Sequence, residues 1–177
     1  VDLGEMRSAT GSWCADLFGQ DPDGPVADLM DLFAASWTRL AEVIDGFGSC
    51  LDLVAAAGHS ADRLVELLAW EHKMYRDVSH DGERVPLFKR AQITAVDLSL
   101  AFDGEGPGRF DDLDRLTMFA DNLVPHVLRL AGVLAYDDAL LTRIEADELL
   151  EHDSVEEVEI RAVAVHAVEQ VVACSTL

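Results

Sequence analysis

The sequence predicts an all-α protein, and two observations lead to this prediction. Apolar residues recur at helical spacing, most plainly from Val26 to Ile44. Strong breakers such as the run from Asp103 to Gly108 separate the periodic stretches, and no stretch alternates long enough for a sustained strand. With 177 residues, half of them hydrophobic, the chain can bury a sizeable core. We therefore expect a single all-α domain, residues 1–177, folded as a helical bundle.

The first half of the chain divides at turn and cap residues. The expected elements are, in order, an irregular leader at 1–25, a helix at 26–44, a short helix at 51–57, a helix after Ser60, and a polar loop at 72–85 with at most a short extended piece. Gly46 and Gly48 end the long helix. Ser60 is a good N-cap for the next helix. That helix should bury Leu64, Leu67, Leu68 and Ala69.

The second half is predicted to hold five helices. They run from Pro86 to about Phe102, from the Asp111-Asp112 pair to Ala120, onward from Pro125, from Asp138 to Glu145 after an Asp137 cap, and from Ser154 to about Ala173. Pro86 suits a first helical turn. Pro125 should push Val124 out of the α region, which places a junction between two helices at 121–124. Ser154 and Glu157 have the spacing of a capping box.

The charge of the chain excludes some partners. The net charge is −21 at pH 7, whereas nucleic-acid backbones and anionic membranes require basic patches. No stretch approaches the ~20 apolar residues of a membrane span, and no secretory signal is visible. We expect an acidic protein that binds neither nucleic acid nor membrane.

Cysteine and histidine spacing predicts neither disulfides nor a metal site. The three cysteines, an odd number without close spacing, are Cys14, Cys50 and Cys174. Reduced thiols favour a cytoplasmic location. The six histidines form no close ligand pair, so we expect no metal and no cofactor.

Lys89 is the first residue that could take part in catalysis. It is one of two lysines in a chain with eleven arginines, which indicates a need for a compact amine. It shares a helix side with an apolar stripe made of Ile93, Val96 and Leu100. The alternative is a lysine whose stem covers this stripe while its amine reaches water.

Asp121 is the second candidate, at the expected junction before the helix of Pro125. A carboxylate there can stabilise the positive charge that develops on a sugar when a glycosidic bond breaks, or can attack the sugar. The alternative is an ordinary helix cap.

Four strings in this order and spacing resemble one known family. They are Leu87 to Ile93, Leu116 to Asp121, Val124-Pro125, and Ser154 to Ala162. The chain resembles the queuosine salvage family, nucleoside 5′-phosphate N-glycosidases that release queuine from queuosine 5′-phosphate. The resemblance covers about 29–172, with the specific motifs within 76–172. It implies a helical fold similar to DNA glycosylases and HEAT-like repeats, a small nucleotide as substrate, and Lys89 with Asp121 as the catalytic couple.

Several neighbours of the couple are candidate substrate-binding residues. Phe88 could stack on the base. Arg90 could bind phosphate bidentately, or could pair with Asp97 on its own helix. Arg76, in a string that resembles the family's Phe-Arg-Asp, could contact the substrate or could form an ion pair that tethers its loop.

The remaining candidates lie after Asp121. Asn122 and Leu123 stand where relatives usually have Tyr-Arg, and His126 replaces a Gln and could act as an acid or base. Arg161 lies between Glu157 and Glu159 and is predicted to be a salt-bridged helix residue.

These departures leave alternatives to the plain assignment. Family members are longer, with an N-terminal portion for which we find no counterpart before about Leu29. The chain could therefore be a diverged member that acts on another nucleoside or C–N bond in specialised metabolism. It could also be a non-catalytic binding subunit, with a homo-oligomer or a partner chain that completes the fold.

Overall fold

The computed structural model describes residues 2–79 and 85–175, and the expected all-α class is confirmed. Residues 80–84 of the expected polar loop lie outside the described residues. The helices are α1 (Leu3–Arg7), α2 (Gly11–Phe18), α3 (Ala27–Phe47), α4 (Cys50–Ala55), α5 (Ala61–Glu71), α6 (Lys89–Ala101), α7 (Leu123–Leu130), α8 (Asp138–Glu145) and α9 (Val155–Ser175). Two 3₁₀ turns, η1 (Gly106–Gly108) and η2 (Leu113–Arg115), and an antiparallel pair, β1 (Val78–Ser79) with β2 (Val85–Pro86), complete the described fold.

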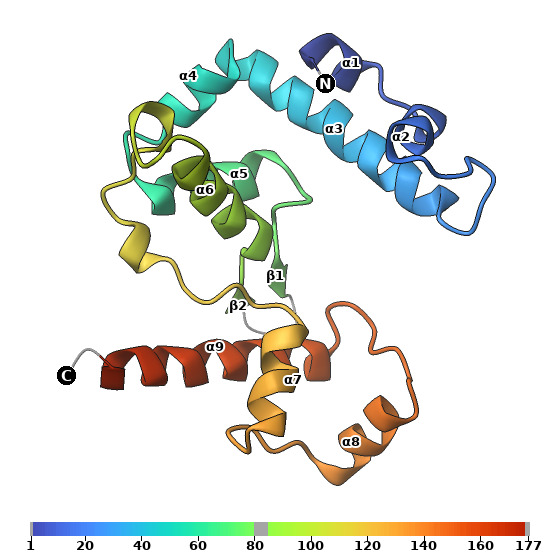
Figure 1. Ribbon diagram of the computed structural model, residues 1–177, viewed down its shortest axis with the longest axis vertical. Coiled ribbons are helices and arrows are strands. Elements are labelled where there is room, and N and C mark those ends of the chain that lie inside the picture. The colour runs from blue at the N-terminus through green and yellow to red at the C-terminus, as the bar shows by residue number, and fades with distance from the viewer. Residues whose placement is uncertain (1, 80–84, 176–177) are drawn as a thin grey trace.

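The first 25 residues are not an irregular leader, as their composition had indicated. Asp2 and Glu5 form a capping box that starts α1, and Thr10 caps α2. Both helices pack on α3 (Figure 1). A small core made of Cys14, Ala15, Met30 and Ala34 lies between α2 and α3, whereas Leu3 of α1 packs against the main core. Burial raises the pKa of the Cys14 thiol, which keeps it protonated and unreactive.

The main core lies between α3, α4, α5 and α6. Its buried members are Val43, Ile44, Leu53, Ala57, Ala61, Leu64, Val65, Leu68, Ala91 and Ala95. Ser60 caps α5 as predicted, because its hydroxyl accepts from the Arg63 amide at 3.2 Å. Leu64, Leu68 and Ala69 are buried, and Leu67 is only partly buried. Gly48, not Gly46, ends α3.

The chain between α5 and α6 departs from the predicted helix start. Pro86 belongs to β2, and α6 begins three residues later at Lys89. The amides of Leu87 and Phe88 both donate to the carbonyl of Asp77, at 2.9 and 3.1 Å. These bonds hold the segment beside Asp77, and the left-handed backbone of Phe88, φ 46°, separates it from the right-handed helix that begins at Lys89.

The helix predicted from Asp111 to Ala120 is wrong. Only the three residues of η2 are helical there, and the chain then runs without regular structure to α7. Val124 lies inside α7, not outside the α region, since Pro125 occupies the first turn, where a proline needs no amide partner.

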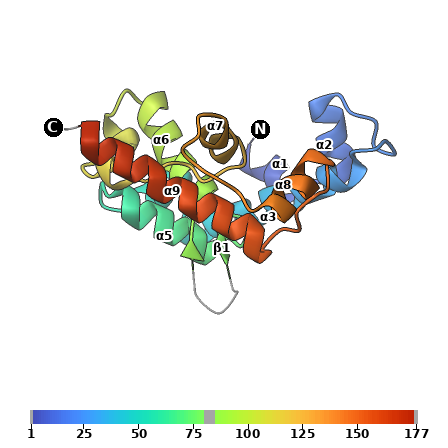
Figure 2. The same ribbon diagram turned by 90° about the horizontal axis from the view of Figure 1, so that it is seen from below.

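The C-terminal helices follow the predicted boundaries closely. Asp137 caps α8 by accepting from the Ala139 amide at 2.8 Å. Ser154 accepts from the Glu157 amide at 3.3 Å, but the Glu157 carboxylate returns to the amide of Asp153. In the view of Figure 1, helix α9 runs below strands β1 and β2, and α7 packs against it; Figure 2, seen from below, shows α9 in front of α7. Among the residues that the structure describes, no helix is long and apolar enough to cross a membrane.

Candidate active site

Lys89 and Asp121 meet in a cleft, as the sequence predicted. The Lys89 ammonium Nζ lies 3.8 Å from the Asp121 Oδ2. The side chains are 33% and 25% exposed, so both are partly shielded from water and yet accessible. They line a cleft of about 1190 Å³, between the start of α6, the start of α7 and the faces of α8 and α9. A cleft of this size accommodates a small ligand.

The two carboxylate oxygens of Asp121 have different partners. Its Oδ1 accepts from the amides of Leu123 and Val124, at 2.9 and 3.0 Å, and so caps α7. Its Oδ2 faces Lys89. The carboxylate therefore lies between the partial positive charge at the start of α7 and the ammonium of Lys89. The capping and catalytic interpretations of Asp121 are therefore compatible.

Arg161 holds the two halves of the site together. Its Nε donates to the carbonyl of Ala120 at 2.9 Å, and its two terminal nitrogens bond the carboxylates of Asp77 and Glu157. The residue is only 9% exposed. Burial lowers the pKa of Arg161, but the Asp77 and Glu157 carboxylates outweigh this and raise it overall. The predicted salt-bridged role is confirmed, and the bond to Ala120 adds a contact that the sequence did not indicate.

Asp77 and Gln92 connect the remaining segments. Asp77 Oδ2 also accepts from the backbone amide of Lys89 at 3.3 Å, so it links Arg161 to the start of α6. The buried Gln92 amide bonds Thr117: its oxygen accepts from the Thr117 amide at 2.8 Å, and its nitrogen donates to the Thr117 hydroxyl at 3.1 Å. The Lys-Arg-Ala-Gln string thus supplies both an ammonium for the site and the side chain that fixes the Thr-Met-Phe-Ala-Asp string.

Four of the five predicted substrate-binding residues line the same cleft. These are Arg76, Arg90, Asn122 and His126. Arg90 donates to the carbonyl of Met74 at 3.1 Å and does not pair with Asp97.

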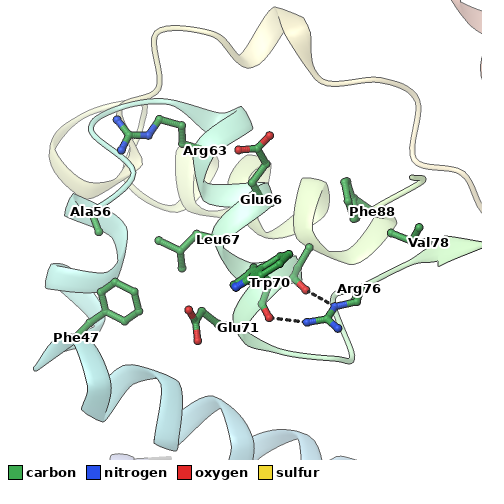
Figure 3. Close-up of a pocket in the computed structure, with 11 residues that line it drawn as sticks. Phe47, Ala56, Arg63, Glu66, Leu67, Trp70, Glu71, Arg76, Val78 and Phe88 are labelled. Carbon is green, nitrogen blue, oxygen red and sulfur yellow. Dashed lines mark hydrogen bonds between the residues drawn. The ribbon is translucent and has the colours of Figure 1, made fainter. Parts of the chain in front are cut away.

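Phe88 is placed differently from the prediction, and Arg76 lines the cleft but does not form the ion pair that was its alternative role. The Phe88 side chain lines a separate pocket of about 570 Å³ with Trp70 (Figure 3) and does not line the cleft that holds Lys89 and Asp121. It has a left-handed backbone, φ 46°, which turns its side chain away as α6 begins. Arg76 lines both hollows and forms no ion pair with Asp77. Its guanidinium donates to the carbonyls of Ala69 and Trp70 and lies 5.8 Å from the centre of the Trp70 ring (Figure 3).

Arg129 and Tyr136 are among the cleft-wall residues that sequence reasoning missed. Arg129 lies in the last turn of α7, and its guanidinium carbon lies 5.9 Å from the centre of the Tyr136 ring. Both line the cleft. The position of Arg129 on the helix predicted onward from Pro125, eight residues after Asp121, was the signal that could have pointed to it. Within the described residues, no cluster of three or more His, Cys, Asp or Glu side chains could hold a metal ion.

Comparison with known proteins identifies the family. The sequence model described as "Queuosine salvage protein" matches residues 7–176. The chain belongs to the queuosine salvage protein family. The match begins well before Leu29, so the predicted start of the resemblance was too late: α2 and the start of α3 belong to it.

Curated members of the queuosine salvage family give the same result. A protein of Sphaerobacter thermophilus is 46% identical over 172 residues, which cover 96% of this chain and 53% of the relative. One of Dictyostelium discoideum is 34% identical over 170 residues, or 96% of this chain and 52% of the relative. A protein of Mus musculus is 38% identical over 123 residues, which cover 69% of this chain and 36% of the relative. All three are named queuosine 5′-phosphate N-glycosylase/hydrolase, and the chain spans about half the length of the first two.

Proposed function

We propose that this protein is an N-glycosidase that hydrolyses a nucleoside 5′-phosphate, with queuosine 5′-phosphate as substrate and queuine as the released base. The observation that carries the proposal is the 3.8 Å approach of the Lys89 ammonium to Asp121 Oδ2 in an open cleft. The names of the relatives support the choice of substrate.

The chemistry requires one anion beside the sugar. As the bond between the anomeric carbon and the base nitrogen breaks, its electron pair leaves with the base and positive charge develops on the sugar. Asp121 Oδ2 stabilises this charge or adds to the anomeric carbon. Water then supplies hydroxide to that carbon and a proton to the base nitrogen. The products are the free base and ribose 5-phosphate.

The contacts of Asp121 suit this role. Its Oδ1 is held by two backbone amides, which fixes the direction of the carboxylate, while Oδ2 is left for Lys89 and the substrate. In many enzymes, charge that is held ready in this way contributes more to the rate enhancement than any other effect. His126 lines the same cleft and is exposed, so it can exchange the base's proton with water.

The test is the variant Asp121→Asn, assayed for queuine release by chromatography. The amide oxygen can still accept from Leu123 and Val124, so α7 should keep its cap. The charge is lost, and release should fall by ~10²-fold or more. Asp137→Asn is a matched control, since it makes the same change at the cap of α8, away from the couple. Equal turnover by Asp121→Asn and the parent protein would refute the mechanism.

A second candidate is hydrolysis of a different nucleotide, and one observation favours it. Asn122 and Leu123, which replace the expected Tyr-Arg, lie in the wall of the cleft. A side-by-side assay on queuosine 5′-phosphate and a panel of purine and 7-deazapurine nucleotides separates the two. Faster cleavage of a nucleotide with another base would support the alternative that this protein is a diverged family member with a different substrate.

The partner alternatives are proposals as well. If a homo-oligomer or a second chain completes the site, the mass in solution under assay conditions should exceed that of one chain. Full activity from a monomer would exclude both.

A further inference from the structure

Arg129 carries an unsatisfied donor in the wall of the cleft. Its Nε is buried, and within the described residues that atom has no hydrogen-bond partner. A buried donor left unpaired is costly, and native proteins rarely contain one unless a ligand or water satisfies it.

The charge balance of the chain makes this unsatisfied arginine unusual. There are 34 Asp and Glu residues for 13 Lys and Arg, so carboxylate partners are plentiful. The other arginines of the cleft are engaged. Arg76 and Arg90 donate to backbone carbonyls, and Arg161 uses its Nε and both terminal nitrogens. Two carboxylates of the cleft, Glu148 and Glu157, pair with Arg143 and Arg161 and not with Arg129.

Tyr136 holds the Arg129 guanidinium in place. The ring centre lies 5.9 Å from the guanidinium carbon. Burial raises the pKa of Tyr136, against the opposing effect of the Arg129 charge, so the ring is neutral at pH 7 and presents its π face. A guanidinium over a ring keeps its N–H edge free, and that edge matches the oxygens of a phosphate bidentately.

The position of Arg129 relative to Asp121 fits a nucleotide. Asp121 caps α7, and Arg129 is eight residues further on, about 12 Å along the axis at 1.5 Å per residue. Arg129, Asp121 and Lys89 all line the same cleft, so a single ligand there can contact all three side chains. The phosphate of a nucleoside 5′-phosphate is one sugar removed from the bond that breaks. We propose that Arg129, held on Tyr136, binds the 5′-phosphate of the substrate; this rests on the proposed function.

The test compares a phosphorylated and an unphosphorylated substrate. Arg129→Gln should lower kcat/KM for queuosine 5′-phosphate by roughly 30-fold or more, the size expected for a lost charge-assisted hydrogen bond. It should leave kcat/KM for queuosine itself nearly unchanged. Arg129→Lys should recover only part of the loss, because an ammonium lacks the planar fork. Arg63→Gln is the matched control, since it removes the same charge from the other pocket.

A binding measurement separates this inference from the proposed function. Calorimetry with ribose 5-phosphate and with ribose needs no turnover. Arg129→Gln should reduce the affinity for ribose 5-phosphate to that for ribose, while Arg63→Gln should not. If the parent protein cleaves neither substrate but shows this binding pattern, the function fails and the phosphate site stands. If it cleaves queuosine 5′-phosphate and Arg129→Gln changes neither measurement, Arg129 does not bind phosphate.

Discussion

The Nε of Arg161 donates to the backbone carbonyl of Ala120 at 2.9 Å, one residue before Asp121. The same guanidinium bonds Asp77, which also accepts from the amide of Lys89. One buried side chain on α9 therefore positions both members of the couple, although it belongs to neither segment. A rigid support of this kind keeps catalytic groups at a set separation.

We expect Arg161→Gln to destabilise the fold and the site together. Removing one member of a buried ion pair leaves the Asp77 carboxylate uncompensated, which costs about 3–5 kcal/mol of unfolding free energy. Queuine release should fall as well, because the couple loses its alignment. Denaturant unfolding and the release assay measure the two effects.

The control for Arg161 is Arg143→Gln. Arg143 makes two ion pairs, with Glu148 at 2.8 Å and Glu156 at 3.1 Å, but its side chain is 37% exposed. Ion pairs this exposed are screened by water, so Arg143→Gln should unfold close to the parent protein. In a double-mutant cycle, Asp77→Asn and Arg161→Gln should show a coupling energy of about 1–3 kcal/mol. Additive losses would mean that the Asp77 pair does not hold the site.

Local signals predicted much of this structure. Ser60, Asp137 and Ser154 start their helices as expected, and the boundaries of α8 match the prediction, because caps act over three residues. The meeting of Lys89 and Asp121 was also predicted, but from the family resemblance, since no local rule joins positions 32 residues apart.

Long-range hydrogen bonds account for what the sequence could not reveal. The stretch after Asp111 has apolar residues at helical spacing, yet the Asp111 amide donates to the carbonyl of His59 and the Thr117 amide to the side chain of Gln92. The Thr117 bond removes a donor that the helix would use, and the Asp111 bond fixes the start of the segment against the end of the turn before α5. The partners lie 52 and 25 residues away, beyond any window of local periodicity.

Asp112 should make stability depend on acid. Burial tends to raise its pKa, but hydrogen bonds from the Ser60 hydroxyl and the Ala61 amide, both at 2.6 Å, outweigh this and lower it below the ordinary 3.8. A carboxyl with a depressed folded pKa stabilises the fold above its unfolded pKa and loses this effect as pH falls through the folded value. The contribution should therefore be present at neutral pH and should fade progressively as the pH falls below the ordinary value of 3.8.

The measurement for Asp112 is thermal unfolding from pH 7 to pH 3. Asp112→Asn should melt below the parent protein at pH 7, and the gap should close as the pH falls. The neighbouring Asp111→Asn serves as a control, because Asp111 pairs with Arg109 at a well-exposed site. If the difference in melting temperature stays constant from pH 7 to pH 3, the charge of Asp112 is not what stabilises its contact with the start of α5.

The last prediction concerns the two residues after Asp121. Asn122 and Leu123 are exposed in the cleft wall, Leu123 at 63%, so larger side chains there meet solvent and not the core. Asn122→Tyr with Leu123→Arg should lower KM for queuosine 5′-phosphate by ~10-fold or more. A stacked ring contributes ~1–3 kcal/mol to binding, and each 1.4 kcal/mol is a tenfold change in affinity.

The Leu123→Arg change should also restore part of the activity when it is added to the Arg129→Gln variant, since either guanidinium can bind the phosphate. KM values from initial rates check both statements. An unchanged KM in the double variant would mean that the substrate does not reach this wall, and would favour a different nucleotide.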